Sequence, residues 1–201
     1  MKLLIISSSQ RSPSQSANVG RYIAENSQQF SSIAHLELCQ YRLPFWDGDR
    51  QSEQLLDSDW PQISQQVAAA DALVLITPEW GGMASPLLKN FLLLCDNQHT
   101  AHKPTLLVAV SSGISGAYPI AELKMNALKN NKLVAIPDHL IIRNSNKVLQ
   151  QGGHDPRDAD LKQRIGYSLH MLHQYSTALS TIRNNHQDRP YPKQQEYSYG
   201  M

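Results

Sequence analysis

The chain has 201 residues, which is enough for one domain with a sizeable core. Its 18 basic and 17 acidic side chains nearly cancel, so the charge gives no reason to expect a nucleic acid or an anionic membrane as a partner. No stretch approaches the ~20 apolar residues of a membrane-spanning helix, and the apolar start is too short for a secretion signal. Cys39 and Cys95 lie far apart without metal-ligand spacing, so we expect buried free thiols and a cytoplasmic protein.

Strand and helix patterns alternate along the chain. We expect strands near residues 2–7, 33–38, 71–77, 104–111 and 132–136. We expect helices near 16–28, 58–69 and 87–95, a helix from about 118, and a long helix from Asp155-Pro156-Arg157-Asp158 to about Ile182. This alternation predicts an α/β fold with a doubly wound five-stranded parallel sheet and helices on both faces. Residues 1–184 are expected to form one domain, and residues 185–201 a polar tail that is loosely ordered or lies on a partner.

Three of the apolar runs each end at a loop of small residues. The runs with their loops are Leu3–Ile6 with Ser7–Ser16, Ala72–Ile76 with Thr77–Gly82, and Leu106–Val110 with Ser111–Gly116. Continuous apolar runs fit strands buried on both faces of a parallel sheet. Ligands of such sheets bind outside the carboxyl ends of the strands, so we expect the three loops to meet at one edge.

The first loop is rich in hydroxyl groups and contains one arginine, Arg11. The GxGxxG pattern of dinucleotide-binding folds is absent after the first strand. Hydroxyls, loop N–H groups and a following helix N-terminus suit a terminal phosphomonoester better than a bridging pyrophosphate. The alternative interpretation is a helix cap, at Ser14 or Ser16, beside a solvated arginine, and both roles can coexist.

The expected helix at 87–95 is apolar on nearly every side. Its leucines and Phe91 cannot all face one sheet, which favours a second protein surface packed against this helix. The histidine pairs His99/His102 and His170/His173 have no carboxylate or cysteine nearby to complete a metal site, so we expect no metal.

Three segments in order resemble the NADPH-dependent FMN reductase family of the flavodoxin-like fold, over about residues 1 to 145. They are Ser8-Ser9-Gln10-Arg11 with the serines that follow, Pro78-Glu79-Trp80-Gly81-Gly82 with Ser85-Pro86-Leu87-Leu88-Lys89-Asn90, and Ser112-Gly113-Ile114-Ser115-Gly116. Ser8 replaces the family's glycine, Trp80 its tyrosine and Gly81 its asparagine. The resemblance implies the sheet order 2-1-3-4-5, FMN as cofactor, NADPH or NADH as electron donor, and a homodimer or dimer of dimers paired through the helix at 87–95.

The resemblance also assigns the site. The FMN phosphate is expected at Ser9, Arg11, Ser14, Gln15 and Ser16; the ring and ribityl chain at Pro78, Glu79, Trp80, Gly81 and Gly82; and the other edge of the ring at Ser112, Gly113, Gly116 and Tyr118. For Trp80 a place beside the flavin, in the dimer interface or in the core stays open, and the loop at 113–116 can be an ordinary turn. No side chain has to act as a base, because the flavin carries the chemistry.

We therefore expect an FMN-dependent NAD(P)H oxidoreductase that passes hydride from NADPH through FMN to a flavin, quinone, azo or similar acceptor by a ping-pong mechanism. The alternative is a flavodoxin-like electron carrier, or a flavin-binding module, without NAD(P)H reductase activity.

Overall fold

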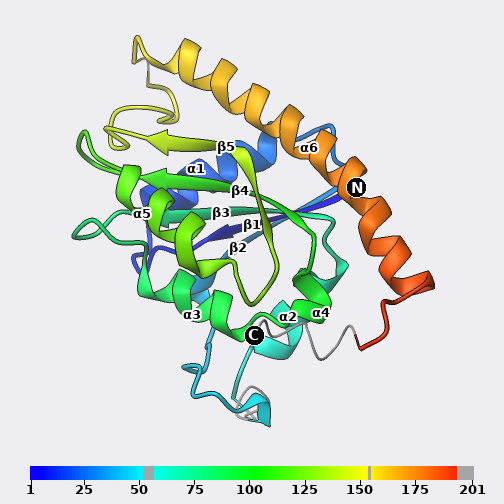
Figure 1. Ribbon diagram of the computed structural model, residues 1–201. Helices are drawn as coiled ribbons and strands as arrows, with labels where there is room; N and C mark the ends of the chain where they lie inside the picture. Colours follow the sequence, from blue (N-terminus) through cyan, green and yellow to red (C-terminus); the bar gives the residue numbers. More distant parts are fainter. Residues whose placement is uncertain (52–56, 154, 194–201) are drawn as a thin grey trace.

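A computed structural model of the protein describes residues 1–51, 57–153 and 155–193. Its centre is a five-stranded parallel sheet with the order β2-β1-β3-β4-β5, which confirms the expected topology (Figure 1). The strands are β1 (Lys2–Ser7), β2 (Ser32–Glu37), β3 (Ala72–Pro78), β4 (Pro104–Val110) and β5 (Val134–Ile142). The helices are α1 (Gln15–Glu25), the 3-10 turn η1 (Leu38–Gln40), α2 (Trp60–Ala69), α3 (Pro86–Leu94), α4 (Asn97–Thr100), α5 (Ala117–Glu122), the π-helical turn η3 (Leu123–Ala127) and α6 (Asp158–Asp188).

The sheet separates two apolar layers. In β1, Leu3 and Ile5 pack toward α1 and α6, whereas Leu4 and Ile6 pack toward α2 and α3. This alternation follows from the two-residue period of a strand. Every residue of β3 and β4 is buried, as the continuous apolar runs predict for central strands of a parallel sheet.

Strand β5 differs from the sequence-based expectation, because it extends beyond residue 136 to Ile142. Its pairing with β4 shifts register between Thr105 and Leu107, which lie opposite Ala135 and His139. The irregularity accommodates Pro137, which cannot donate to a strand ladder and is tolerated at an edge or a bulge. The apolar stretch Leu140–Ile142 is therefore the second half of one edge strand.

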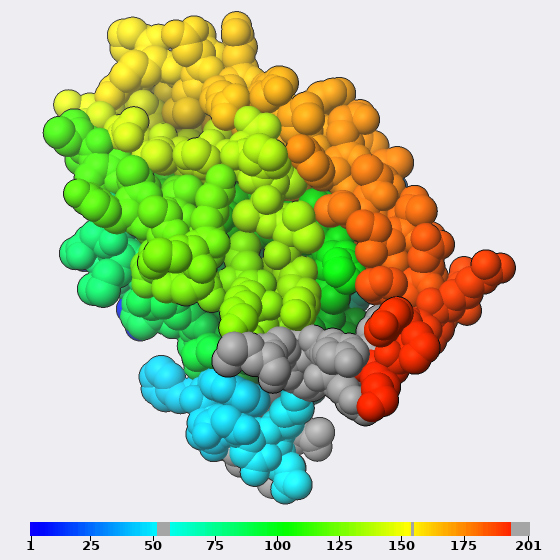
Figure 2. Space-filling model, viewed as in Figure 1, coloured from blue at the N-terminus to red at the C-terminus, as the bar shows by residue number. Residues whose placement is uncertain are grey.

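Helix α6 also exceeds its expected length, since it runs to Asp188 rather than to about Ile182. Its last turns, coloured orange to red, project at the rim of the molecule (Figure 2). The first residues of the expected tail, 185–188, are thus helical, and residues 194–201 of that tail lie outside the described part of the chain.

The same chain covers most of the apolar surface of α3, so less of this surface is left for a second protein than the sequence pattern alone suggested. Phe91 packs edge-on against Trp60 of α2, with ring centroids 5.8 Å apart. Asn90 fastens a loop over the helix, because its side chain donates to the Pro44 carbonyl at 2.9 Å and accepts from the Trp46 N–H at 2.9 Å. Of the large apolar side chains on α3, Leu93 is the exposed one, at 56%.

Hydrogen bonds between buried serines fasten the carboxyl ends of β1 and β3 to the start of α3. Ser8 donates to the Ile76 carbonyl from its N–H at 3.0 Å and from Oγ at 2.8 Å. Ser85 Oγ donates to the Ser8 carbonyl at 2.8 Å and accepts from the Leu88 N–H at 3.1 Å as the N-cap of α3. The Ser85 N–H donates to Thr77 Oγ1 at 2.9 Å.

Within the described residues, no helix has the length and apolar character needed to span a bilayer.

We predict that Ser85→Ala lowers the free energy of unfolding by about 1–3 kcal/mol, because it removes a helix cap and leaves buried Ser8 with one partner fewer. Urea denaturation followed by circular dichroism measures the difference. Ser31→Ala is the control, since this exposed serine lies outside the helices and strands, and its effect should stay within about 0.5 kcal/mol. Equal stability of wild type and Ser85→Ala would show that the serine network does not stabilise the fold.

Candidate functional site

A cavity of about 370 Å³ lies at the carboxyl edge of the sheet, where the three predicted loops meet. Its lining includes the predicted residues Ser9, Arg11, Ser14, Gln15, Ser16, Pro78, Glu79, Trp80 and Ser112. The other predicted residues, Gly81, Gly82, Gly113, Gly116 and Tyr118, do not line this cavity.

The first loop ends at the N-terminus of α1, which points its positive dipole end into the cavity region. Ser14 is the N-cap of α1, and its side chain accepts from the Ala17 N–H at 3.1 Å. Of the two predicted caps, Ser14 and Ser16, the structure therefore selects Ser14. Helix geometry leaves the N–H groups of Gln15 and Ser16 without intrahelical partners. Ser16 is held in place because its carbonyl accepts from Ser7 Oγ at 3.1 Å. This arrangement provides N–H donors for an anionic group.

Arg11 reaches across the mouth of the cavity to the second loop. Its guanidinium carbon lies 5.4 Å from the ring centroid of Trp80, which is a cation–π contact. Arg11 is exposed and Trp80 is half-exposed. Of the alternatives for Trp80, the structure excludes a place in the core. Both side chains are free to change partner when a ligand enters.

The second loop makes a tight turn between Trp80 and Met83. These residues exchange backbone hydrogen bonds of 3.2 and 3.0 Å. Gly81 and Gly82 both have positive φ, +57° and +76°, a conformation that glycine adopts without steric cost. A Cβ at Gly82 would lie 3.9 Å from Tyr118, so the turn and the predicted rim residue Tyr118 are neighbours.

Glu79 joins the second loop to the third. One of its carboxylate oxygens, Oε2, accepts a hydrogen bond from Ser115 Oγ. The other, Oε1, is buried and has no hydrogen-bond partner among the described residues. Because Glu79 lines the cavity, a ligand hydroxyl or ring N–H would complete this oxygen's bonding. FMN carries both kinds of donor, on its ribityl chain and its ring, so the residues present fit this cofactor.

A carboxylate on α5 holds the far side of the second loop. Glu122 accepts from the Ala84 N–H at 2.7 Å and from Lys89 Nζ at 3.0 Å. Burial alone would raise the pKa of Glu122, but these two hydrogen bonds and the Lys89 charge lower it below its ordinary value. The carboxylate is therefore ionised at neutral pH and anchors the loop. No sequence pattern predicts this role of Glu122.

The third loop owes its Gly116 to packing. Gly116 has φ +114°, and a Cβ there would lie 2.4 Å from Ile141 Cγ2. A Cβ at Gly113, in contrast, would meet nothing within 4 Å. The alternative interpretation of this loop as an ordinary strand-to-helix turn thus explains Gly116. Of the residues predicted in the third loop, Ser112 lines the cavity.

Four lining residues were not predicted: Pro13, Asn18, Val110 and Ser145. Ser145 reaches the site because β5 continues to Ile142 and ends at the same edge as the other strands. The sequence contains a pattern that could have predicted Ser145: Leu140–Ile142 is an apolar run followed by polar residues, like the runs that end at the three predicted loops. In the same segment Gln150 donates to the Gln15 side chain at 3.1 Å, which fixes one side of the first loop.

No group of three or more histidine, cysteine, aspartate or glutamate side chains is placed to hold a metal ion in the described ranges. Cys39 and Cys95 are free thiols, with Cys95 buried and Cys39 half-buried.

The sheet order and the cavity at the carboxyl ends of the strands define a flavodoxin-like fold with a loop-lined cavity at the start of α1. The sequence model of the NADPH-dependent FMN reductase family matches residues 1–147, and the chain belongs to this family. The resemblance seen in the three loops is thereby confirmed, together with FMN and NAD(P)H as the cofactors of the family.

Two curated relatives are azoreductases. The NADPH azoreductase of Bacillus sp. (strain OY1-2) is 30% identical over 142 residues, covering 71% of this chain and 76% of the relative. The FMN-dependent NADPH-azoreductase of Staphylococcus aureus (strain USA300) is 26% identical over 156 residues, covering 76% and 82%. Among solved structures, the flavoenzyme NAD(P)H:(acceptor) oxidoreductase FerB of Paracoccus denitrificans superposes with a TM-score of 0.68 at 17% identity, covering 88% of this chain and 97% of that one. This last likeness concerns the fold.

Proposed function

We propose that this protein oxidises NADPH or NADH and passes the electrons, through FMN held at the carboxyl edge of the sheet, to a flavin, quinone, azo or similar acceptor. The observation that carries the proposal is the cavity lined both by the first residues of α1 and by Glu79, whose Oε1 has no partner among the described residues, in a chain of the FMN reductase family. Bound FMN supplies the hydride chemistry, and the protein supplies position and electrostatics.

The residues of the first two loops divide the binding work. The N–H groups of Gln15 and Ser16 and the hydroxyl of Ser9 supply donors for the phosphate. Arg11 adds a fixed charge and a planar fork of donors when it leaves the Trp80 ring. Glu79 accepts from a ligand hydroxyl or ring N–H.

Large apolar and aromatic side chains lie exposed beside the second loop, close to the charged Arg11. Tyr118 is 69% exposed and Met83 54% exposed beside the Gly81-Gly82 turn, and neither carries charge. Hydride transfer from the nicotinamide needs no acidic or basic side chain. We infer that NADPH and the acceptor occupy the same space in turn.

The test of this function is an anaerobic titration of the FMN-loaded protein with NADPH, followed by absorbance. We expect the ~450 nm flavin band to bleach, and initial-rate plots against both substrates to give the parallel lines of ping-pong kinetics. Bound FMN that stays oxidised would instead support the electron carrier, and failure to bind FMN would remove the assigned site. Intersecting lines would contradict the shared space for donor and acceptor.

We predict that Arg11→Ala weakens FMN binding by about 10- to 100-fold, because a charge-assisted hydrogen bond is worth about 1.5–3 kcal/mol. Fluorescence titration measures the dissociation constant. Riboflavin, which lacks the phosphate, is the matched control ligand, and its affinity should be the same for both proteins. Unchanged FMN affinity in the variant would exclude Arg11 from the phosphate site.

We also propose that two copies pair through α3. Leu93 is exposed on this helix, and Phe45, Met83, Tyr118 and Met125 are large apolar side chains exposed elsewhere on the chain. Sedimentation velocity at micromolar concentration should give twice the 22.5 kDa chain mass. Leu93→Glu should shift the protein toward a monomer, whereas Tyr167→Glu on α6 should not. A wild-type protein that sediments as a monomer would contradict the pairing.

A cytoplasmic location is part of the same proposal. The two free thiols, Cys39 and Cys95, agree with a reducing compartment. Fractionation of the producing cells would check it, and recovery in an extracellular or membrane fraction would contradict it.

A further inference from the structure

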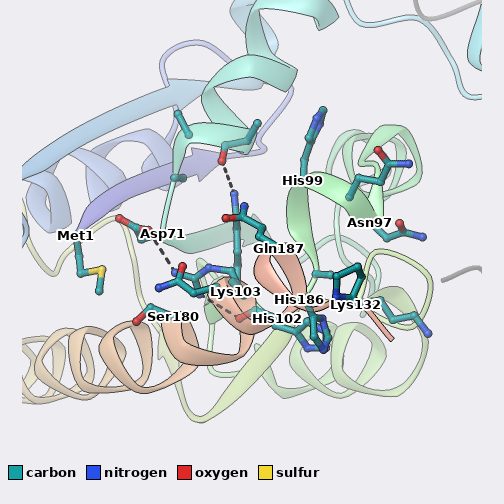
Figure 3. A pocket seen from close by; sticks show the side chains of 18 of the residues that line it. Met1, Asp71, Asn97, His99, His102, Lys103, Lys132, Ser180, His186 and Gln187 are labelled. Atoms are coloured by element: carbon teal, nitrogen blue, oxygen red, sulfur yellow. Dashed lines mark hydrogen bonds and ion pairs between the residues drawn. The ribbon is translucent and has the colours of Figure 1, made fainter. Parts of the chain in front are cut away.

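A second and larger cavity, of about 1080 Å³, opens at the opposite edge of the sheet, where the strands begin (Figure 3). We call it the amino-edge cavity. It lies between the turn before β3, the loops before β4 and β5, and the last turns of α6. The lining residues that matter here are Asp71, His102, Lys103, Lys132, Arg183 and His186. It shares no lining residue with the flavin-type cavity.

Positive charge is concentrated in this cavity. Lys103, Lys132 and Arg183 bring three cations, whereas Asp71 is the one carboxylate in the lining. The whole chain has a net charge of only +1, so the surplus is local. Asp71 already accepts from the Lys2 N–H at 2.8 Å and from Arg183 Nη2 at 3.3 Å. In the described part of the chain no carboxylate forms an ion pair with Lys103 or Lys132.

Two of these cations are held in place before any ligand arrives. Arg183 donates from Nη1 to the His102 carbonyl and from Nη2 to Asp71, both at 3.3 Å, and its side chain is 14% exposed. A guanidinium has five N–H donors, so Arg183 keeps donors for a ligand. Lys103 Nζ donates to the Val67 and Ala68 carbonyls at 2.6 and 2.7 Å, which leaves its third N–H. Cations fixed in this way lose little entropy when an anion binds.

Two residues that line the cavity have a strained backbone. His102 and Lys132 have φ of +62° and +55°, a left-handed conformation that is uncommon for residues other than glycine. The His102 N–H donates to the Lys132 carbonyl at 2.9 Å, so the two strained residues support each other. Strain of this kind is concentrated at ligand sites.

Two imidazole groups, of His102 and His186, lie close to these positive charges. The rings of His102 and His186 lie edge to face, with centroids 4.8 Å apart. Burial lowers the pKa of His102, and the neighbouring His186, Lys132 and Arg183 lower it further. Burial and the Arg183 charge likewise lower the pKa of Lys103 to about 8. Asp71 balances Arg183, whereas Lys103 and Lys132 form no ion pair with a carboxylate in the described part of the chain.

We propose that the amino-edge cavity is a second ligand site, which binds a small molecule carrying a phosphate-type group with two or more negative charges. Lys132 and the remaining N–H donors of Arg183 contact the anion. The volume exceeds what a bare anion needs, and Ala68, Ala69 and Ala70 offer an apolar wall for an organic body. The site is independent of the flavin-type site, since the buried sheet lies between them.

Calorimetric titration of the FMN-loaded protein with inorganic pyrophosphate tests the proposal, because FMN keeps the probe out of the flavin-type cavity. We expect one binding site per chain, with affinity reduced about tenfold or more in Lys132→Asn and in Arg183→Gln. Asparagine tolerates the left-handed backbone at position 132, so this variant keeps the fold if Arg183→Gln does not. Lys129→Asn is the matched control, because this exposed lysine lies three residues away and outside the cavity lining.

Several results would overturn the proposal: no heat of binding at millimolar pyrophosphate, unchanged affinity in both cavity variants, or an equal loss in Lys129→Asn. The Arg11→Ala protein should bind pyrophosphate as the wild type does, which separates this site from the flavin site. ADP is the second probe. Tighter binding of ADP than of pyrophosphate, again lost in Lys132→Asn, assigns the site to an organic phosphate, and equal affinity assigns it to an inorganic one.

Discussion

The hydrogen bonds among Ser8, Ile76 and Ser85 are the contacts on which the flavin-type site depends. Ser8 fixes the turn after β1 to the end of β3 with bonds of 3.0 and 2.8 Å to one carbonyl. Ser85 donates to Ser8 at 2.8 Å and at the same time caps α3. These groups are buried, so water cannot replace a lost partner. The loop that leads into α1 and the loop that leads into α3 therefore behave as one body, and the first two parts of the site cannot shift independently.

In contrast to this buried serine network, the side chains at the opening of the site are exposed or half-exposed. Arg11 and Tyr118 are exposed, and Trp80 is half-exposed. The proposed function, with two reactants that enter in turn, calls for this combination. The buried serine network would hold the cofactor in one position, while the exposed side chains would adapt to a nicotinamide and then to a different acceptor. Glu79 and Glu122 hold the loops that carry these side chains. Glu79 accepts a hydrogen bond from Ser115 of the third loop, and Glu122 accepts one from the N–H of Ala84, which follows the second loop.

The sequence predicted the parts of the fold that are set by local pattern. The runs of β1, β3 and β4 are apolar throughout because both faces of these strands are covered, and that pattern needs no tertiary knowledge. The prediction that β5 ends near residue 136 was wrong, because an edge strand with a proline and a register shift has no simple alternation of apolar and polar residues. That error also hid Ser145. The cover on α3 could not be predicted either, because it comes from a loop near residue 45 that is distant in sequence.

The cavities at the two edges of the sheet present different kinds of groups to an anion. The carboxyl edge offers N–H and hydroxyl donors with one exposed arginine, which suits a cofactor that has to be oriented by many weak, directed bonds. The amino edge offers cations that are fixed by the protein, which suits recognition of charge itself. Asp71 links this second edge to both α6 and β1, because it accepts from Arg183 and from the Lys2 N–H. An anion bound there would thus pull on the end of α6 and on the starts of the strands. The fully buried β3 and β4 lie between this edge and the serine network, and a close-packed core of this kind leaves the floor of the flavin-type site in place.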